Sequence, residues 1–263
     1  MPDPQPSGGF RWVQAPWGVV LHCEALVPHA DHFFTTASLR LKDRPEEWEA
    51  IASHAGVARE CLLLLRQVHG NNIVTVRSGD TGPWLPPQAD AASSDDPASA
   101  LVIQVADCAP ILLADTRCGV VAAIHAGWRS TMQRIVIHTI EEMGTQFGTR
   151  ADDLIAAIGP SLGECCAEMG EEVVEAFRAA GHDGSDIEAW FSRSLGAKPH
   201  FNLWAANRDQ LIDAGMNAGA IHSAGLCTRT YKDVFHSYRA AGPGAGRMAA
   251  VIRPGKPAMP PRV

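Results

Sequence analysis

The chain has 263 residues, of which 46% are hydrophobic and 19% charged, and its formal net charge is −7 at pH 7. This acidic balance argues against a protein that grips a nucleic-acid backbone, because such a protein needs a basic face. No stretch approaches the ~20 apolar residues that a membrane helix needs, so we expect a globular protein that binds neither nucleic acid nor membrane.

Apolar runs typical of buried strands recur along the chain. In chain order they lie at 18–26, 61–65, 72–76, 101–105, 110–115, 119–126, 153–159 and 248–252. Helical patterns alternate with them at 44–56, 130–144, 169–181 and 202–215, with Pro45 in a first turn and Ser130 or Thr131 as a cap candidate. A Pro-, Gly-, Asp- and Ser-rich segment at 78–97 is predicted to be a long loop. The alternation predicts a single α/β domain with mixed β-sheets covered by helices.

The seven cysteines are an odd number without regular spacing and without a CxxC pair, so they do not indicate a disulfide framework. The Pro- and Gly-rich N-terminus has neither the basic region nor the apolar run of a secretory signal. We therefore expect a cytoplasmic protein with free thiols. Residues 1–12 and 254–263 are predicted to be flexible tails around a domain at 13–253.

Residues of metal-binding type lie at or near the ends of three of the apolar runs. His69 follows the second run, Cys108 lies between the fourth and fifth, and His125 ends the sixth. Strand ends that lead into a loop or helix are where α/β proteins build their sites. Two imidazoles and a thiolate, with a fourth position for water, are typical of catalytic zinc. The residues could instead only pack, or Cys108 and His125 could be a nucleophile and its base without a metal.

Six segments of the chain resemble one known family. They are RQVHG at 66–70, ADCAPILLAD at 106–115, AAIHAGWRST at 122–131, IGPSLGECC at 158–166, LCT at 226–228 and FHSYRAAGPGAGRMAAVI at 235–252. They resemble the laccase-domain proteins, once labelled multicopper polyphenol oxidases and now regarded as purine nucleoside phosphorylases. Peptidoglycan editing factors carry the same domain. The resemblance runs in order from about His32 to Ile252, nearly the whole chain.

The resemblance implies a metal ion, zinc, held by His69, Cys108 and His125. It implies phosphorolysis of adenosine, inosine and methylthioadenosine, with purine nucleoside and phosphate as partners and some deamination of adenosine. It also implies a cytoplasmic enzyme that is a monomer or a weak homodimer. The implied fold is a mixed α+β sandwich similar to that of cysteine-hydrolase-like toxins. Copper could also enter such a Cys/His site, since it outcompetes zinc for most N and S ligands.

Phosphorolysis requires fixed positive charge for the phosphate dianion and a proton donor for the purine. The candidate phosphate-binding residues are Arg66, Arg129 and Arg239, which could otherwise form surface ion pairs. Asp107 is a candidate catalytic residue beside Cys108, either as proton donor or as an orienting group, unless it only caps a loop. Ser237 and Tyr238 are expected to line the substrate pocket, unless the tyrosine only packs against its neighbours.

Several positions depart from the family pattern. Ala37 and Ala240 stand where arginines are expected, Ala167 replaces a tyrosine and Ser130 a glycine. Each lost arginine would be worth roughly 1.5–3 kcal/mol to an anion. One alternative is therefore an editing or metal-binding protein with weak nucleoside activity, and another is a thiol hydrolase that uses Cys108 and His125. A copper laccase is disfavoured, because its cluster needs His-x-His pairs and the 11 histidines contain none.

Overall fold

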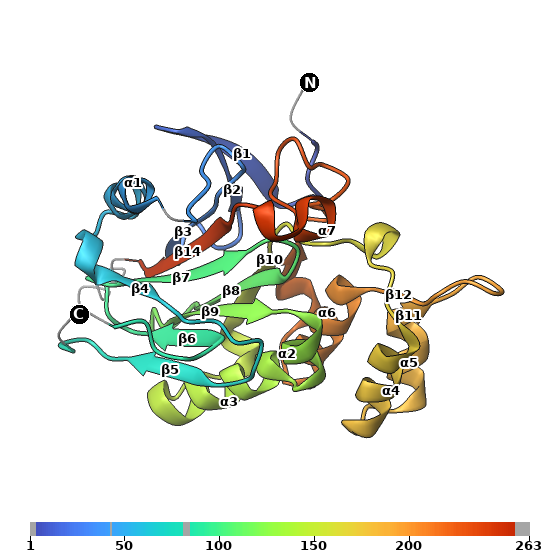
Figure 1. Ribbon diagram of the computed structural model, residues 1–263. Helices are drawn as coiled ribbons and strands as arrows, with labels where there is room; N and C mark the ends of the chain where they lie inside the picture. Colours follow the sequence, from blue (N-terminus) through green and yellow to red (C-terminus); the bar gives the residue numbers. More distant parts are fainter. Residues whose placement is uncertain (1–3, 43, 81–84, 256–263) are drawn as a thin grey trace.

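Two six-stranded sheets lie face to face in the computed structural model, which describes residues 4–42, 44–80 and 85–255 (Figure 1). The first sheet contains, in spatial order, β1 (Phe10–Ala15), β2 (Gly18–Cys23), β3 (Ala30–Phe34), β14 (Met248–Pro254), β7 (Ala100–Val105) and β4 (Leu62–Leu64). The second contains β13 (Ile221–Ser223), β10 (Leu154–Ile158), β8 (Ala109–Asp115), β9 (Val121–Ala126), β6 (Ala91–Ser94) and β5 (Ile73–Val76). Both sheets mix parallel and antiparallel pairs.

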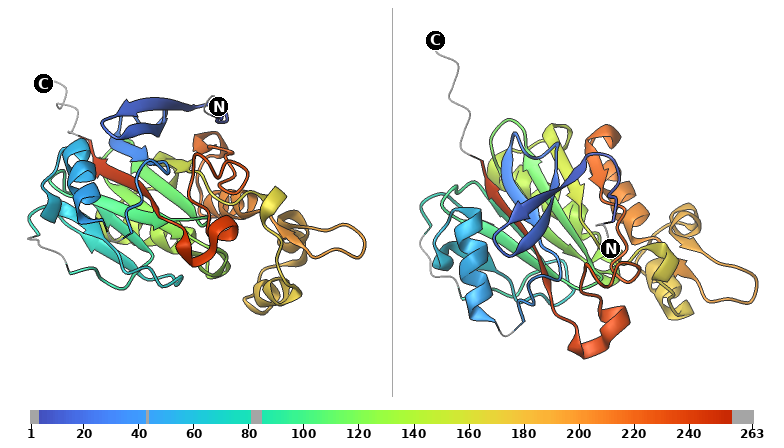
Figure 2. Two further views of the ribbon diagram at one scale, coloured as in Figure 1. Left: turned by 45° about the horizontal axis from the view of Figure 1, so that its top comes forward. Right: turned by 90° about the horizontal axis from the view of Figure 1, so that it is seen from above.

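Helices cover the outer face of each sheet. The α-helices of the described residues are α1 (Pro45–Ala55), α2 (Trp128–Met132), α3 (Ile135–Phe147), α4 (Glu171–Ala179), α5 (Gly184–Trp190), α6 (Leu203–Asp213) and α7 (Tyr238–Ala241). Helix α1 packs on the first sheet, whereas α3 and α6 pack on the second. Helices α4 and α5, with the short hairpin β11 (Phe191–Ser192) and β12 (His200–Phe201), extend from one side of the sandwich (Figure 2). The predicted mixed α/β fold is confirmed, while the likeness to the toxin fold stays a prediction.

Strand β8 shows why the central runs are apolar without interruption. Successive side chains of a strand point to opposite faces. Ile111 and Leu113 join the core beneath the helices, and Leu112 and Ala114 join the core between the two sheets. All seven residues of the strand are buried. A strand whose two faces are both covered therefore shows no alternation of polar and apolar residues. Each of the eight predicted apolar runs contains a strand in the structure.

Helix α1 follows the sequence prediction in detail. Pro45 occupies its first turn, where the missing N–H costs no hydrogen bond, and Gly56 ends it in the left-handed conformation at φ 69°. Trp48, Ile51 and Ala55 lie on one face and are buried against the first sheet.

The predicted helix at 130–144 is wrong in its boundaries, because the chain forms two helices there. Arg134 separates α2 from α3 with a left-handed backbone at φ 56°, and its guanidinium donates to the carbonyls of Ala180 and Gly181. Ser130 and Thr131 are buried inside α2, whose cap residue is Gly127. A tertiary contact therefore stabilises a break that helical periodicity does not reveal.

The predicted loop at 78–97 is also wrong in part, since it contains β6. This strand lies between β5 and β9 in the second sheet, next to the edge strand, and all four of its residues are buried. Its sequence, AASS, consists of small residues with weak strand preference, which hid it. Residues 81–84, including Trp84, lie outside the described residues.

The expected tails begin and end differently in the structure. Strand β1 starts at Phe10 and pairs with β2 along its whole length, so residues 10–12 belong to the first sheet. The indole of Trp12 donates to the carbonyl of Pro4, which ties the preceding segment to this strand. At the other end β14 extends to Pro254, and residues 256–263 lie outside the described residues. None of the helices in the described ranges is both long and apolar enough to cross a membrane.

Gly159 tests the packing between the sheets. A Cβ at this position would enter the ring of Phe34 and approach Cγ of Pro110 to 3.0 Å, and both neighbours lie in packed strands. We expect Gly159→Ala to lower the free energy of unfolding by about 1–3 kcal/mol, as overpacking usually does. Urea denaturation measures the change. Gly184→Ala, where a Cβ meets nothing within 4 Å, is the matched control and should stay within about 0.5 kcal/mol of wild type. Equal stability of the two variants would contradict the prediction.

Candidate functional site

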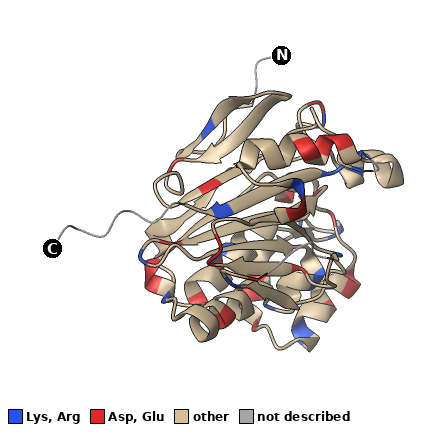
Figure 3. Cartoon of the chain, turned by 90° about the vertical axis from the view of Figure 1, so that its left-hand side faces the viewer, with Lys and Arg blue, Asp and Glu red and all other residues tan. Residues whose placement is uncertain are grey.

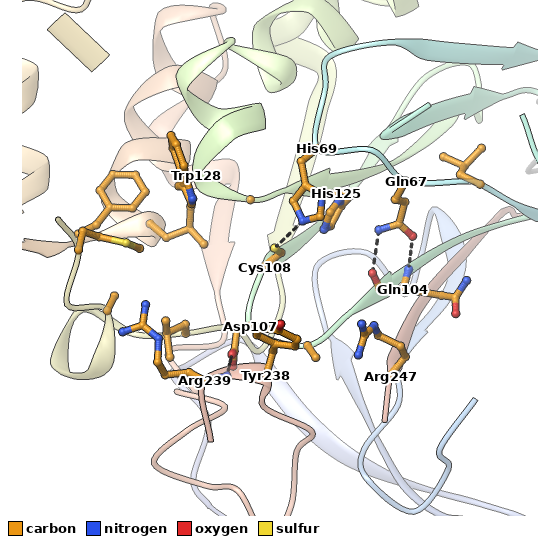
Figure 4. Close-up of a pocket in the computed structure, with 18 residues that line it drawn as sticks. Gln67, His69, Gln104, Asp107, Cys108, His125, Trp128, Tyr238, Arg239 and Arg247 are labelled. Atoms are coloured by element: carbon orange, nitrogen blue, oxygen red, sulfur yellow. Dashed lines mark hydrogen bonds between the residues drawn. The ribbon is translucent and has the colours of Figure 1, made fainter. Parts of the chain in front are cut away.

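A pocket of about 630 Å³ lies at the end of the sandwich where the chain twice crosses from the first sheet to the second (Figure 4). The connection from β4 to β5 carries His69, and the connection from β7 to β8 carries Cys108. His125 lies near the end of β9, with its Cα opposite that of Pro110. All three side chains line the pocket. The sheet packing therefore brings together residues that are far apart in sequence.

The three side chains form a compact group of metal-ligand atoms. One ligand atom from each residue lies within 4.8 Å of the other two. Cys108 Sγ is 3.9 Å from His69 Nε2, and the two imidazole rings lie edge to face with centroids 4.8 Å apart. This nitrogen and sulfur donor set suits zinc and similar divalent metals. The described residues at the pocket could thus hold one metal ion.

Asp90, which sequence reasoning missed, organises this group. It is fully buried immediately before β6, and its carboxylate accepts a hydrogen bond from Nδ1 of His125 at 2.8 Å. The same carboxylate accepts the backbone N–H groups of Val68, His69 and Gly70 at 2.8–3.1 Å. Because Nδ1 of His125 is engaged, its Nε2 is left for a metal. The signal for Asp90 was hidden because the segment around it resembles a loop.

Close backbone contacts hold the two connections against each other. The side chain of Gln67 donates to the carbonyl of Gln104 and accepts its N–H, both at 2.8 Å, which fastens the first connection to β7. A Cβ on Gly127 would lie 3.0 Å from Cys108 Sγ and 3.2 Å from the His69 ring. His69 itself has a left-handed backbone with φ 61°, a conformation that costs energy without glycine. Such strain, held by several contacts, is typical of functional sites.

The electrostatics of Cys108 and His125 are coupled. Burial raises the pKa of the Cys108 thiol, but His125 and His69 beside it lower that pKa to about 6. Burial lowers the pKa of His125, while Cys108 and Asp90 raise it to about 9. Hydrogen bonds from His125 and from the backbone of the first connection likewise hold the pKa of Asp90 below its usual value despite burial. A thiolate is the form of cysteine that binds metals and attacks electrophiles, so the group suits either chemistry.

Asp107 lines the pocket, but both of its carboxylate oxygens are engaged. Oδ1 accepts the hydroxyl of Thr228 at 2.6 Å, and Oδ2 accepts the N–H of Arg239 at 2.5 Å. Its backbone carbonyl accepts the N–H of Leu162. Asp107 therefore joins three segments around the pocket, which agrees with its alternative interpretation as a loop-capping residue.

The predicted anion-binding residues are divided between the pocket and the surface. Arg239 lines the pocket, and so does Arg247, which was not predicted although it lies in the last family-like segment. Arg66 is exposed and donates to the side chain of Gln88 at 2.7 Å. Arg129 is exposed with its guanidinium 4.2 Å from the ring centroid of Trp128. Neither Arg66 nor Arg129 is among the residues that line the pocket.

Ser237 also differs from the expectation that it lines the pocket. It is buried and caps α7 by accepting the N–H of Ala240, whereas the next residue, Tyr238, lines the pocket and is half exposed. Figure 4 shows Tyr238 between Arg239 and Arg247, across the pocket from His69 and Cys108. Gln67 and Gln104 add polar groups, and most of the remaining wall is apolar, with Leu65, Trp128, Leu162, Ala167, Met169, Phe201 and Leu203 among its residues. The pocket thus combines a metal-type group, two cations and an apolar surface.

Charged residues elsewhere are mixed in sign. In the view of Figure 3, Lys and Arg are interspersed with Asp and Glu along the described chain. Ala37 and Ala240, which stand where family arginines are expected, are not among the residues that line the pocket. The positive charge at the pocket comes instead from Arg239 and Arg247.

Comparisons with known proteins agree with the sequence resemblance. Residues 39–254 match the family described as multi-copper polyphenol oxidoreductase laccase. The chain is 37% identical to a purine nucleoside phosphorylase of Deinococcus radiodurans, over 86% of this chain and 88% of that protein. It is 40% identical to a purine nucleoside phosphorylase of Bacteroides thetaiotaomicron over 62% of this chain and 60% of the relative.

Two further relatives add a second activity and a structure. A protein named adenosine deaminase RL5, from an unknown prokaryotic organism, is 36% identical over 75% of this chain and 76% of its own. The crystal structure of YlmD from Geobacillus stearothermophilus has a TM-score of 0.84 at 25% identity and covers 93% of this chain and 99% of that one.

Replacement of Asp90 tests whether this carboxylate positions the metal-type group. Asp90→Asn puts an amide N–H₂ among four N–H donors, so we expect a 10–100-fold weaker affinity for Zn²⁺. Competition with a chromophoric chelator measures it. The matched control is Asp96→Asn, a buried carboxylate that accepts the N–H of Ala98 and the hydroxyl of Ser99 in a turn outside the pocket lining. Both variants should lose stability, but only Asp90→Asn should lose affinity. A wild-type zinc affinity in Asp90→Asn would disprove this role.

Proposed function

Because this chain belongs to the multi-copper polyphenol oxidoreductase laccase family, we propose that it is a zinc-dependent purine nucleoside phosphorylase. Its proposed substrates are adenosine, inosine and methylthioadenosine with phosphate, and adenosine deamination is a secondary activity. Relatives named purine nucleoside phosphorylase and adenosine deaminase support this class of chemistry. The observation that carries the proposal is the His69, Cys108 and His125 group in a pocket with two arginines. We also propose a cytoplasmic location and a monomer or weak homodimer.

His69, Cys108 and His125 are the proposed zinc ligands. Three protein ligands leave a coordination position for substrate or water, as catalytic zinc requires. Asp90 supports the proposal because it orients His125 and the backbone of His69 at once. Zinc, when bound, supplies a Lewis acid that polarises a substrate oxygen or a bound water.

Arg239 and Arg247 are the proposed phosphate-binding residues. Each uses Nη1 to hold backbone carbonyls, those of Cys166 and Glu168 for Arg239 and those of Ala245 and Gly246 for Arg247. These hydrogen bonds orient the two guanidinium groups. The described residues make no hydrogen bond to Nη2 of either arginine, which leaves this donor for an anion. A phosphate held here is a dianion opposite the positive charge that develops on the sugar as the glycosidic bond breaks.

The apolar wall suits the purine. Trp128, Phe201 and Leu203 offer flat and aliphatic surface to a planar base, and the side chain of Gln104 adds a polar group. A phosphate oxygen attacks the anomeric carbon, the bond from that carbon to the purine nitrogen breaks, and the proton that the hydrogen phosphate dianion gives up passes to the leaving base. Ala167 lies in this wall where the family resemblance expects a tyrosine, so the smaller side chain leaves more room for the base.

A product assay tests the reaction. Purified protein incubated with adenosine, inosine or methylthioadenosine should release free base only when phosphate is present, and adenosine should also give some inosine. Removal of the metal with a chelator should abolish both reactions, and added Zn²⁺ should restore them. Chromatography identifies the products. Base release without phosphate would mean hydrolysis, and silence on all three nucleosides would favour an editing or metal-binding role.

A second candidate function is a metal-free thiol hydrolase. The side chains of Cys108, His125 and Asp90 favour this function. Their arrangement resembles that of a nucleophile, its general base and the group that orients the base. The chelator experiment separates the two candidates. A protein that stays fully active after complete chelation but is inactivated by thiol alkylation would overturn the zinc mechanism.

Arg247→Met tests the proposed phosphate site. Loss of a charge-assisted hydrogen bond of roughly 1.5–3 kcal/mol should raise the KM for phosphate about 10–100-fold, with a much smaller effect on the KM for nucleoside. Steady-state kinetics, with the phosphate and nucleoside concentrations varied in turn, measures the two KM values separately. Arg66→Met, at an exposed arginine outside the pocket lining, is the matched control and should behave as wild type. The assignment fails if both variants change the KM for phosphate equally.

A further inference from the structure

A second group of metal-ligand atoms lies outside the main pocket. Cys165, Cys166 and Cys227 place their sulfur atoms within 4.8 Å of one another. The Sγ atoms of Cys165 and Cys166 are 3.6 Å apart, and each lies within 3.7 Å of the hydroxyl of Thr230. None of the three cysteines lines the main pocket, and the proposed nucleoside reaction does not use them.

The backbone holds this thiol cluster in place. Cys165 and Cys166 lie on a short 3₁₀ turn at Glu164–Cys166, and Cys227 lies some sixty residues later in the chain, after β13. Ser161 pairs with Cys227 in a parallel bridge and accepts the N–H of Thr228 at 3.0 Å. The approach is so close that a Cβ on Gly163 would lie 3.1 Å from Cys227 Cβ. The sulfur atoms are therefore brought together by the fold and not by flexible side chains alone.

The dimensions of the cluster fit a metal ion. With metal–sulfur bonds of about 2.3 Å, sulfur atoms on one ion lie roughly 3.8–4.0 Å apart. The cluster thus needs only small side-chain movements to close on an ion. Among the described residues, no fourth His, Cys, Asp or Glu joins the group. Structural zinc sites use four ligands, whereas soft thiolates without a fourth ligand favour copper(I).

The surroundings of the cluster suit a soft monovalent ion. On one side Cys227 packs with Leu162 and Ala167, with Cys166, Met169 and Trp204 against them, so that side is apolar. On the other side Cys165 is exposed in a hollow of about 540 Å³ lined also by Arg193, Lys198 and His200. The hollow provides an entry path to the sulfur atoms. Its charges are balanced, because Glu164 also lines it and Arg193 and Lys198 pair with Glu171 and Glu168.

We propose that Cys165, Cys166 and Cys227 form a second metal site that binds one copper(I) ion through three thiolates. Binding displaces the thiol protons to solvent and changes no oxidation state. The site shares a turn with the main pocket, because Arg239 donates to the carbonyl of Cys166. The proposal does not depend on the proposed nucleoside chemistry.

Copper(I) binding tests the proposal directly. The full chain, saturated with Zn²⁺ to fill the first site, is titrated under anaerobic conditions with copper(I) bicinchoninate, and copper withdrawn from the coloured complex is measured. We expect one copper(I) per chain for wild type and for Cys108→Ala. Cys165→Ala, at the exposed and least packed member, should bind at least tenfold more weakly. X-ray absorption should show about three sulfur neighbours at roughly 2.3 Å and no nitrogen.

Cys118→Ala is the matched control, because Cys118 is an exposed cysteine in another part of the fold. It should bind copper as wild type does. Thermal melting of each metal-free variant verifies that it is folded. If Cys165→Ala does not fold, Cys166→Ala replaces it and should show the same weaker binding of copper(I). The proposal is overturned if copper is lost from Cys108→Ala but kept by Cys165→Ala. It is equally overturned if the wild type binds no copper(I) in the anaerobic titration and forms a disulfide within the cluster when a separate sample is exposed to air.

Discussion

The site depends on the hydrogen bonds that the buried carboxylate of Asp90 accepts. This carboxylate accepts one hydrogen bond from the imidazole of His125 and three from the backbone at 68–70. These partners belong to a strand of the second sheet and to a connection between the sheets, so one side chain sets the relative position of two metal-type residues. A buried carboxylate is costly unless it is fully hydrogen-bonded, and here four donors offset that cost. The arrangement is therefore a rigid one.

The packing of the sheets sets where the site forms. Strands β4 and β7 are parallel neighbours in the first sheet, so the connections that follow them leave the same end of the sandwich. These connections bring His69 and Cys108 to the end of β9. Small residues allow the close approach that follows, as Gly127 does beside Cys108 and Gly159 beside Phe34. The two sites differ in this respect. The main group joins the two connections between the sheets to β9, whereas the thiol cluster lies on a turn beside the second sheet.

The family description refers to copper oxidases, but the residues at the main pocket suit different chemistry. One group of two imidazoles and a thiolate, with arginines and an apolar wall, fits a single metal ion and an anionic substrate beside a planar base. The names of the relatives point in the same direction. The proposed copper(I) site is of another kind, because it consists only of thiolates and carries no open coordination position for a substrate.

Much of the fold could be predicted from the sequence, for a physical reason. Continuous apolar runs reveal strands covered on both faces, and Pro45 and Gly56 mark the ends of α1 because their backbone preferences are local. The family-like motifs also singled out His69, Cys108 and His125 before their positions were known. Local chemistry and motif identity are properties of short segments, which a sequence displays directly.

Only the tertiary structure decided how these segments meet. Strand β6 was hidden because small residues are buried by their neighbours and not by their own hydrophobicity. Asp90 acquired its role from four partners brought to it by the fold, and the two helices at 128–147 separate because Arg134 reaches the carbonyls of Ala180 and Gly181. Likewise Arg247 faces the pocket while Arg66 faces solvent, although both lie in family-like motifs. Side-chain direction and long-range hydrogen bonds depend on the packing of the whole chain, so no local pattern could reveal them.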